Sequence, residues 1–412
     1  MLYLLFAIVF LICIYTLRHY CFTLNRLFGF QRHPYIDVDT ADWPHVTVLV
    51  AAHNEEAVIA NVLTALLEVN YPSEKLIIMP VNDRSTDGTR EIIDHFVQEN
   101  PGRIVPFHRQ SGKPGKAAAL KDATREVRTE VMLIFDADYI PGRSLIKQLV
   151  APFFDPEVGG VMGRVVPLNV SSNLLTRLLD LERAGGYQVD QQARMNLHLV
   201  PQHGGTVGGV RRSALEKAGG WNDNTLTEDT DLTFRLLIGG WKVVYQNRSE
   251  CYEEVPETWP VRIRQIMRWA KGHNQALVTY ELRLLGADKV TFAEKIDGLL
   301  LLGVFAMAPV TLLGWMLAMA AFYRGEAPLH GVITIFAISA YTAIGNFAAF
   351  FQVAAAARLD STRQRIRLLP FMVLGFVVSI FSVTRATISQ LVAPLTGAQF
   401  HWDKTERFRK AT

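Results

Sequence analysis

Long uncharged apolar runs are the feature that most limits what this sequence can fold into. Residues 298–323 carry no charged side chain, and a second such run covers roughly 331–357 and ends at Arg358. A helix needs about 20 apolar residues to cross the hydrocarbon core of a bilayer. Both runs are therefore predicted to be transmembrane helices. Two further runs, 2–17 and 368–395, are candidates, although Arg385 interrupts the last one.

The basic residues beside these runs predict the orientation of the chain. Residues 2–17 lack a preceding basic region and a following small-residue cleavage pattern, so we interpret them as a retained anchor rather than a cleaved signal peptide. Positive charge collects on the cytoplasmic side. Arginines follow both the first and the third run: Arg18, Arg26 and Arg32, then Arg358, Arg363, Arg365 and Arg367. We predict a multi-pass protein of the inner or plasma membrane with residues 20–297 in the cytoplasm, and the topology of 368–412 stays open.

Net charge and cysteine content exclude several classes of protein. The net charge is only +3 over 412 residues, which membrane topology explains, so we expect no nucleic acid partner. Cys13, Cys21 and Cys251 are too few and too scattered for a disulfide framework or a zinc site.

Short β-rich runs alternate with helical periods between residues 45 and 155. The predicted strands cover 45–54, 75–83, 103–109 and 131–138. This alternation predicts an α/β fold with a mostly parallel sheet. Ligands of such sheets bind at the carboxyl ends of the strands. Each predicted strand ends in polar residues, at 53–55, 82–83, 108–109 and 136–138, so we expect a binding site at that edge.

Asp136 and Asp138 are one residue apart at a strand end, so their side chains point the same way. Two such carboxylates suit Mg²⁺ or Mn²⁺ shared with substrate phosphates. The alternative is a strand-ending turn with incidental acids. Asp83 and Lys116 favour the metal, because they add an acceptor for a uracil or ribose edge and a cation for a diphosphate.

Three carboxylates, Glu228, Asp229 and Asp231, precede an apolar run in residues 224–241. They fit a helix start with Thr227 as the N-cap, where backbone N–H groups favour negative charge. They also fit a catalytic base held rigidly at a helix terminus. The family resemblance described below implies that Asp229 is the base and that Glu228 positions it or the acceptor, whereas Asp231 needs no role beyond the first turn.

The segment "QIMRWAKGHNQ", 265–275, precedes the apolar runs. It fits an amphipathic helix at the bilayer surface, with basic residues and Trp near lipid headgroups. Gln265, Arg268 and Trp269 also share one helical face by their i, i+3, i+4 spacing. A donor, a cation and a flat ring on one face are suited to a diphosphate and a sugar.

Taken together, these motifs resemble the membrane synthases of glycosyltransferase family 2, such as cellulose, hyaluronan, chitin and poly-N-acetylglucosamine synthases. The likeness covers about residues 45–275 and rests on seven segments in this order: "AHNEE", "NDRSTDGT", "GKAAAL", "DADYIPG", "GGTVGGVRRSALEKAGGW", "TLTEDTDL" and "QIMRW". The resemblance implies a nucleotide-sugar-binding GT-A fold followed by transmembrane helices.

The resemblance also implies roles for single residues. The implied nucleotide-sugar contacts are Asn54, Glu55, Asp83, Lys116, Asp136, Gln265 and Arg268. The implied metal ligand is Asp138, the base is Asp229, and Trp269 lies at the acceptor site. The tail 400–408, "FHWDKTERF", loosely resembles a segment that closes over the donor.

The expected reaction is inverting transfer of a sugar from UDP-glucose or UDP-N-acetylglucosamine to a growing β-linked polysaccharide, which the adjoining helices extrude. Two alternatives use the same site: a non-processive enzyme that adds one sugar to a membrane lipid, and a mannan synthase that uses GDP-mannose. A non-catalytic membrane protein is disfavoured because Asp138, Asp229 and Arg268 are all present. The expected partners are therefore a nucleotide sugar, a glycan or lipid acceptor, membrane lipids, and proteins that export the product.

The predicted domain organisation has five parts. They are an anchor at 1–20, a cytoplasmic GT-A domain at 21–275, an interfacial helix at 276–297, about three transmembrane helices at 298–395 and a basic tail at 396–412.

Overall fold

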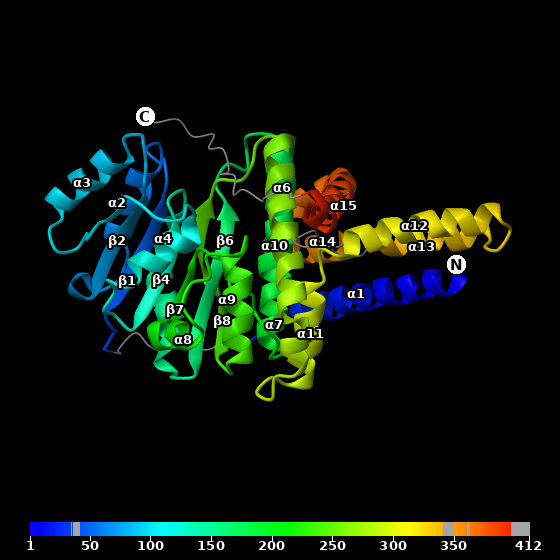
Figure 1. The fold of residues 1–412 in the computed structure, drawn as a ribbon, viewed down its shortest axis with the longest axis horizontal. Coiled ribbons are helices and arrows are strands. Elements are labelled where there is room, and N and C mark those ends of the chain that lie inside the picture. Colours follow the sequence, from blue (N-terminus) through cyan, green and yellow to red (C-terminus); the bar gives the residue numbers. More distant parts are fainter. Residues whose placement is uncertain (34, 36–41, 341–349, 361–362, 397–412) are drawn as a thin grey trace.

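The computed structural model describes residues 1–33, 35, 42–340, 350–360 and 363–396. They form an α/β part around one sheet and a set of helices that projects from one side of it (Figure 1). The long helix α10 (Trp259–Leu285) stands between the two parts, since it packs against α9 (Glu228–Ile238) and also against α15 (Met372–Thr396).

The described residues form an eight-stranded sheet in the order β3-β2-β1-β4-β7-β6-β8-β5. Four neighbouring strands run parallel: β1 (Val46–Ala52), β2 (Leu76–Asp83), β3 (Phe107–Arg109) and β4 (Val131–Asp136). The connections contain α2 (Ile59–Leu67), η1 (Ser73–Lys75), α3 (Thr89–Glu99) and α4 (Lys116–Ala123). The predicted α/β fold is confirmed, and β1, β2 and β4 are almost entirely buried, as strands covered on both faces must be.

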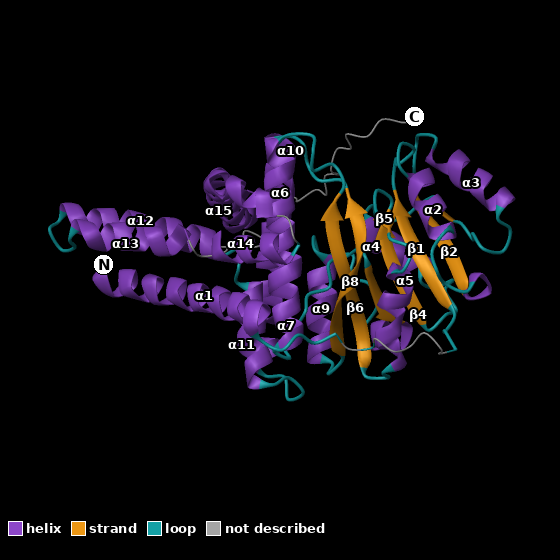
Figure 2. Cartoon of the chain, turned by 180° about the vertical axis from the view of Figure 1, so that it is seen from behind, coloured by secondary structure: helices purple, strands orange, loops and turns teal. Residues whose placement is uncertain are grey.

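The second half of the sheet is mixed rather than parallel (Figure 2). β7 (Gly208–Arg211) runs antiparallel to β4 and to β6 (Val158–Pro167), whereas β6 runs parallel to β8 (Lys242–Glu253) and β5 (Ile140–Pro141) pairs antiparallel with β8. The short, glycine-rich β7 gives little strand signal in the sequence. A Cβ on Gly209 would come within 2.7 Å of Leu133, so glycine is required where β7 packs beside β4.

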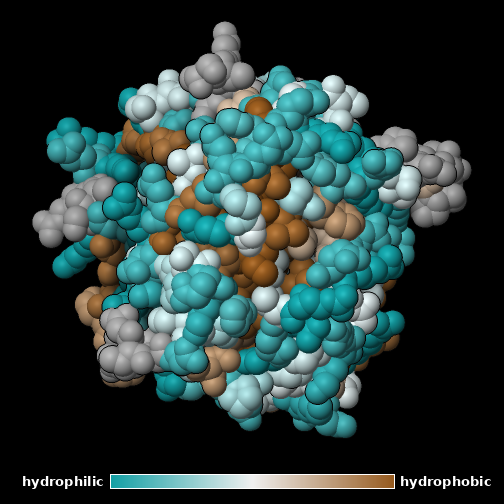
Figure 3. Space-filling view, turned by 90° about the vertical axis from the view of Figure 1, so that its left-hand side faces the viewer, coloured by the Kyte–Doolittle hydropathy of each residue, from teal (hydrophilic) through white to brown (hydrophobic). Residues whose placement is uncertain are grey.

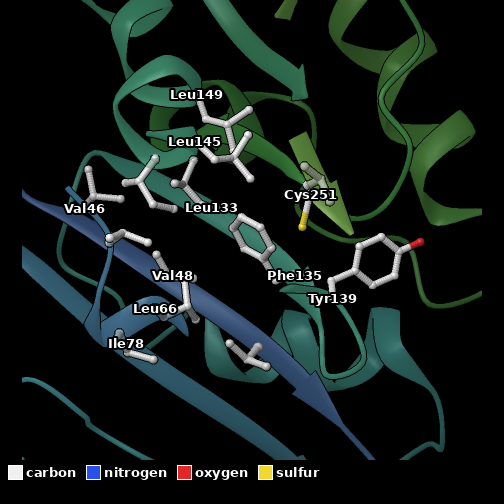
Figure 4. Close-up of a cluster of buried hydrophobic side chains, with 14 of the residues drawn as sticks. Val46, Val48, Leu66, Ile78, Leu133, Phe135, Tyr139, Leu145, Leu149 and Cys251 are labelled. Atoms are coloured by element: carbon white, nitrogen blue, oxygen red, sulfur yellow. The ribbon is translucent and has the colours of Figure 1, made fainter. Parts of the chain in front are cut away.

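One hydrophobic core lies between the sheet and its covering helices (Figure 4). It joins strand residues such as Val48, Leu133 and Phe135 to Leu145 and Leu149 of α5. The remaining helices of this part are α5 (Leu145–Val150), η2 (Ala151–Phe154), α6 (Leu174–Ala184), η3 (Gly185–Gln191), α7 (Gln192–Asn196) and α8 (Arg212–Lys217). The chain continues directly from α6 through η3, a π-helical turn, into α7.

Two described helices are long and apolar enough to cross a membrane, at Leu2–Phe28 and Gln364–Ala393. The first is α1 (Leu2–Phe28); the others in this region are α11 (Phe292–Leu302), α12 (Met307–Tyr323), α13 (Leu329–Ala340), α14 (Phe350–Leu359) and η4 (Arg363–Phe371). The run 298–323, predicted as one helix, is instead divided between α11 and α12, which are bent by 72°. The predicted helix 331–357 lies partly, and the tail 400–408 wholly, outside the described residues.

The bend between α11 and α12 is stabilised by α1. The Tyr15 hydroxyl donates a 2.8 Å hydrogen bond to the Leu300 carbonyl, one of the groups that a helix end leaves without an intrahelical partner. Gly303 follows at the C-cap, and a Cβ there would lie 3.0 Å from the Tyr15 oxygen. The bend therefore depends on a partner almost 300 residues away in the sequence.

The two ends of the molecule differ in the polarity of their exposed side chains. Apolar side chains are exposed along α1, for example Tyr3 (91%) and Phe6 (65%). The opposite end of the molecule is mostly hydrophilic, with hydrophobic residues gathered in the middle of that face (Figure 3). Exposed aromatic residues in water are unfavourable, so the α1 end is suited to lipid and the sheet end to water.

Candidate active site

The carboxyl ends of the parallel strands open into a cavity of about 610 Å³. α9 and α10 complete its walls. All the site residues predicted from the sequence line this one cavity: Asn54, Glu55, Asp83, Lys116, Asp136, Asp138, Glu228, Asp229, Gln265, Arg268 and Trp269. The tertiary structure thus brings together side chains that are up to 215 positions apart in the chain.

Two strand-end loops form one wall of the cavity. Asn54 has a positive φ of 55°, a conformation that Asn tolerates better than most residues. Its side-chain Oδ1 accepts a 2.7 Å hydrogen bond from the backbone amide of Thr86, and its backbone amide donates to Ser85 Oγ at 2.9 Å. The amide of Glu55 donates to Thr89 Oγ1 at 2.8 Å. These bonds tie the loop after β1 to the loop after β2.

Asp83, at the end of β2, is held by several donors. It accepts hydrogen bonds from Arg84 Nε (2.9 Å), Arg109 Nη1 (2.9 Å) and the Gly115 amide (3.2 Å). Burial acts to raise the pKa of Asp83, but the two guanidinium groups and the amide outweigh it and hold that pKa below its ordinary value. Asp83 is therefore an ionised acceptor in a fixed position.

Lys116, at the first position of α4, crosses the cavity. Its ammonium group forms an ion pair with Asp136, donates to the Gly205 carbonyl at 2.7 Å and lies 4.0 Å from Glu228. Burial acts to lower the pKa of Lys116, but Asp136 and then Glu228 raise it above its ordinary value. The cation therefore persists within the cavity, where it can attract a diphosphate.

Asp136 and Asp138 both face the cavity, and Asp138 is only 3% exposed. No group of three or more His, Cys, Asp or Glu side chains among the described residues is arranged to hold a metal ion. Mg²⁺ is commonly bound by one or two carboxylates together with substrate phosphates and water. The two aspartates therefore fit a divalent cation that arrives with a diphosphate, and they do not form a complete protein cage.

α9 begins at Glu228, as predicted, but Thr227 does not cap it with its side chain. Within the described part of the chain, Thr227 Oγ1 has no hydrogen-bond partner. The side chain instead packs on Gly272 of α10, where a Cβ would lie 2.2 Å from Thr227 Cγ2. One first-turn amide is satisfied from within the helix, because Asp229 Oδ1 accepts a 2.7 Å hydrogen bond from the Thr230 amide. Close packing of two helices thus fixes the position of Asp229.

The Asp229 carboxyl group has a strongly altered acidity. Burial and then the negative charge of Glu228 raise the pKa of Asp229 to about 7, although the Thr230 amide and the cations Lys116 and Arg268 act in the opposite direction. A pKa near neutrality lets a carboxylate accept a proton and still be ionised at the working pH. This is the property expected of a general base.

Asp231 has a larger structural role than the predicted first-turn position. It is buried and accepts hydrogen bonds from Tyr280 Oη (2.5 Å), Asn222 Nδ2 (2.8 Å) and Arg235 Nε (2.7 Å). Tyr280 belongs to α10, so Asp231 joins α9 to α10, and unlike Glu228 and Asp229 it does not line the cavity.

Trp269 is enclosed by two arginines that the sequence analysis did not single out. The guanidinium carbons of Arg183 and Arg262 each lie 5.2 Å from the centroid of the Trp269 ring. Arg183 pairs with Glu253, and Arg262 pairs with Glu182. Arg262 precedes Trp269 by seven positions on α10, so helical spacing gave a signal for it, but no local pattern marks Arg183 in α6.

The fold and the site define an α/β protein of the GT-A type, in which the cavity at the strand ends is suited to an anionic, nucleotide-sized ligand. In agreement with this class, residues 44–272 match the family described as "Glycosyltransferase like family 2". The match covers more than half of the 412 residues. The chain therefore belongs to this family of glycosyltransferases.

Several curated proteins are similar in sequence. A "Probable glycosyltransferase YdaM" of Bacillus subtilis is 32% identical over 262 residues, 61% of this chain and 62% of that protein. A "Beta-monoglucosyldiacylglycerol synthase" of Synechocystis is 32% identical over 261 residues, 63% of this chain and 54% of that protein. A "Glucomannan 4-beta-mannosyltransferase 7" of Arabidopsis thaliana is 27% identical over 270 residues, 63% of this chain and 48% of that protein. The matches thus span less than two thirds of each of these relatives.

One solved structure is similar along almost the whole chain. The mannosyltransferase PcManGT of Pyrobaculum calidifontis, in complex with GDP-Man and Mn²⁺, matches 94% of this chain and 98% of its own, with a TM-score of 0.62 and 20% identity. At this level of identity the likeness shows the fold, with its sheet and its helices at both termini.

Proposed function

We propose that the protein transfers one sugar from a nucleoside diphosphate sugar to a hydroxyl group of a membrane lipid, with inversion at the anomeric carbon. The observation that carries the proposal is the pairing of Asp229, whose pKa is raised to about 7, with a cation and two metal-suited aspartates in one cavity. One half of the cavity suits a diphosphate leaving group and the other half a base.

The proposed reaction is a single displacement. Asp83 and the loops after β1 and β2 hold the nucleoside, and Lys116, Gln265 and Arg268 face the diphosphate. A divalent cation bound by Asp138, with Asp136 beside it, would neutralise charge on the leaving diphosphate. Asp229 removes the proton from the acceptor hydroxyl as the oxygen attacks the anomeric carbon. Glu228 tunes the acidity of Asp229, and a covalent sugar–enzyme intermediate is not needed.

A lipid acceptor is favoured by the helices and by the named relatives. α1 exposes aromatic side chains suited to a bilayer and lies on the far side of α10 from the sheet (Figures 1 and 2). A relative at 32% identity carries the name of a glucosyldiacylglycerol synthase. We propose that α1 and the C-terminal helices anchor the protein in the membrane, with the predicted domains in the order given above and the catalytic domain in the cytoplasm.

Product analysis with purified protein tests the proposal. UDP-glucose, UDP-N-acetylglucosamine and GDP-mannose are each supplied with membrane lipid, and nucleotide release is measured with and without Mg²⁺ or Mn²⁺. We expect one donor to give a chloroform-soluble glycolipid and a metal-dependent release of nucleotide. Asp229→Asn should bind the nucleotide normally and lose at least a hundredfold in turnover. Undiminished turnover in that variant would refute Asp229 as the base.

A second candidate is the polymer synthase that the sequence motifs resemble. The specific observation in its favour is Trp269, an aromatic side chain that lines the cavity and the adjoining smaller one and so suits contact with an acceptor sugar. A relative named as a glucomannan mannosyltransferase agrees with it. A water-insoluble product that a β-glycanase or β-mannanase degrades would select this candidate over the lipid.

A further inference from the structure

A second cavity, of about 160 Å³, lies behind Asp229 on the side of the projecting helices. It shares Asp229, Thr227 and Trp269 with the main cavity, so the two spaces adjoin at the proposed base. Its other walls include Arg18 of α1 and Asp190 of η3. A cavity of about 150 Å³ accommodates a benzene ring. The space therefore suits a group no larger than one sugar ring or one glycerol unit.

The wall of this cavity contains buried polar atoms that the described residues do not satisfy. They are His273 Nδ1, Arg18 Nη2, Asp190 Oδ1 and Thr227 Oγ1, whereas Arg194 Nε lies 3.8 Å from Asp297 Oδ2. Nearly all buried polar groups in native proteins have a hydrogen-bond partner, either protein or water, so these atoms beside one space indicate that a polar molecule, water or a ligand, is bound there. The cluster contains donors and acceptors together, which is the complement of hydroxyl groups, since each hydroxyl both donates and accepts.

His273 connects the cavity to the base. The residue is only 7% exposed, and its ring lies 4.8 Å from that of Phe305. Its Nε2 faces the Gln202 amide nitrogen (3.4 Å) and Thr230 Oγ1 (3.3 Å). Because the Gln202 amide nitrogen can only donate, Nε2 is the acceptor and Nδ1 carries the proton of the neutral ring. Nδ1–H is then a donor for a ligand oxygen next to Asp229.

The charges around the cavity balance. Its lining includes three cations and three anions: Arg18, Arg183, Arg194, Glu182, Asp190 and Asp229. Several of them are already paired, since Arg183 contacts Glu253 and both Arg18 and Arg194 contact Asp297. A phosphate-bearing headgroup would require an excess of positive charge. The balance therefore fits an uncharged headgroup.

The same cavity has an apolar side. Leu301, Val304 and Phe305 line it, and they lie at the bend between α11 and α12. α11 and α12 are long and apolar enough to span a membrane only as a pair, so the bend is a place where the cavity meets apolar helices. An acceptor bound here can keep its headgroup beside Asp229 and its hydrocarbon chains among these helices.

We propose that this second cavity binds the uncharged, hydroxyl-bearing headgroup of the lipid acceptor, with His273, Arg194 and Asp190 as its hydrogen-bonding partners. The inference rests on the glycosyl transfer proposed above. The headgroup hydroxyl gives its proton to Asp229, its oxygen forms the new bond to the anomeric carbon, and the bonding pair of the old C–O bond leaves with the nucleoside diphosphate. No oxidant, reductant or further reactant is required.

Lipid probes test the class of acceptor with the full-length enzyme in detergent or nanodiscs. The probes are dioctanoylglycerol, octyl β-glucoside and dioctanoyl phosphatidylglycerol, which carries a phosphate and still offers free hydroxyl groups. We expect one of the two neutral lipids to accept the sugar, which also identifies whether a glycerol or a sugar headgroup is bound, and we expect no transfer to phosphatidylglycerol. Transfer to phosphatidylglycerol at a comparable rate, or only to a soluble oligosaccharide, would overturn the proposal.

Variants of the cavity wall test its location. In His273→Leu the apparent KM for the lipid should rise about tenfold, the effect of one lost hydrogen bond of ordinary strength. The KM for the nucleotide sugar and the slow nucleotide release without acceptor should stay within about twofold of wild type. Arg194→Lys, which keeps the charge but moves the donor, should act in the same direction. His198→Gln, an exposed histidine outside the cavity, is the matched control.

The outcomes separate this inference from the proposed function. If the wild-type enzyme releases nucleotide from none of the donors, the proposed function fails. If it transfers sugar to lipid but His273→Leu and Arg194→Lys both keep the wild-type KM for that lipid, the cavity assignment is wrong and the proposed function survives. If His273→Leu loses nucleotide binding, which would indicate that this variant does not fold, the test rests on Arg194→Lys.

Discussion

The acidity of Asp229 gives the sharpest prediction, because two neighbouring charges act on it in opposite directions. Glu228 raises its pKa and Lys116 lowers it, while burial makes the largest contribution to the value of about 7. If Asp229 is the base, the rate of transfer must follow its ionised fraction. The acidic limb of the pH profile of kcat should therefore have its midpoint near 7 in the wild type.

The expected fall in the transfer rate at low pH follows from that pKa. With a pKa of about 7, roughly a tenth of Asp229 is ionised at pH 6 and about a hundredth at pH 5. Glu228→Gln removes a negative neighbour, so the midpoint should move to lower pH and the variant should retain more of its plateau rate at pH 6. Lys116→Met removes a cation, so its midpoint should move to higher pH, together with a rise in the KM for the donor.

The assay is coupled detection of nucleotide release at saturating donor and acceptor, from pH 5 to pH 9. Glu157→Gln serves as a control, because this exposed acid does not line the cavity and pairs with Lys242 on the surface. The reasoning is refuted if Glu228→Gln leaves the midpoint unchanged or moves it upward. It is also refuted if both variants move the midpoint in the same direction.

Three further predictions concern stability, packing and the acceptor. Between about pH 3.8 and 7 the folded protein keeps the proton of Asp229 and the unfolded chain does not, so the free energy of unfolding falls as the pH rises through this range. Asp229→Asn removes this loss and should therefore increase the melting temperature at pH 8 more than at pH 5. The corresponding gain in the free energy of unfolding has an upper limit of roughly 4 kcal/mol. Gly272→Ala should clash with Thr227, shift the start of α9 and lower kcat at least tenfold, and adding Thr227→Ala should restore part of the loss, as measured in a double-mutant cycle. Trp269→Ala should raise the KM for the acceptor more than the KM for the donor in two-substrate kinetics.

Local patterns in the sequence were sufficient to predict which residues lie together in the proposed donor half of the site. Parallel strands joined by helices place their carboxyl ends on one edge, so polar residues that follow successive strands must meet there. For this reason Asn54, Asp83 and Asp136 could be predicted to lie together, and all line one cavity. The start of α9 was predicted for the same local reason, since acids favour a helix N-terminus.

The acceptor half of the site could not be predicted in this way. Asp190 and Arg194 are four positions apart in one continuous helical stretch, but no short-range rule relates them to Arg18 of α1 or to His273 of α10. Each taken alone has an ordinary interpretation: a basic residue that flanks an apolar helix, or a polar residue within a helix. Only the tertiary structure, in which α1 packs against η3 and α7 and His273 of α10 lines the same cavity, brings these side chains around one space.

The apolar runs show the same difference between what the sequence determines and what only the tertiary structure decides. By itself the sequence determined that this chain has an α/β domain with polar residues at its strand ends and helices suited to a membrane, because strand alternation and hydrophobic length are local properties. It did not determine that 298–323 bends, since the bend is stabilised by Tyr15 from the other end of the chain. It also did not determine the acidity of Asp229, because burial and neighbouring charges set a pKa, and both arise only when distant segments pack together.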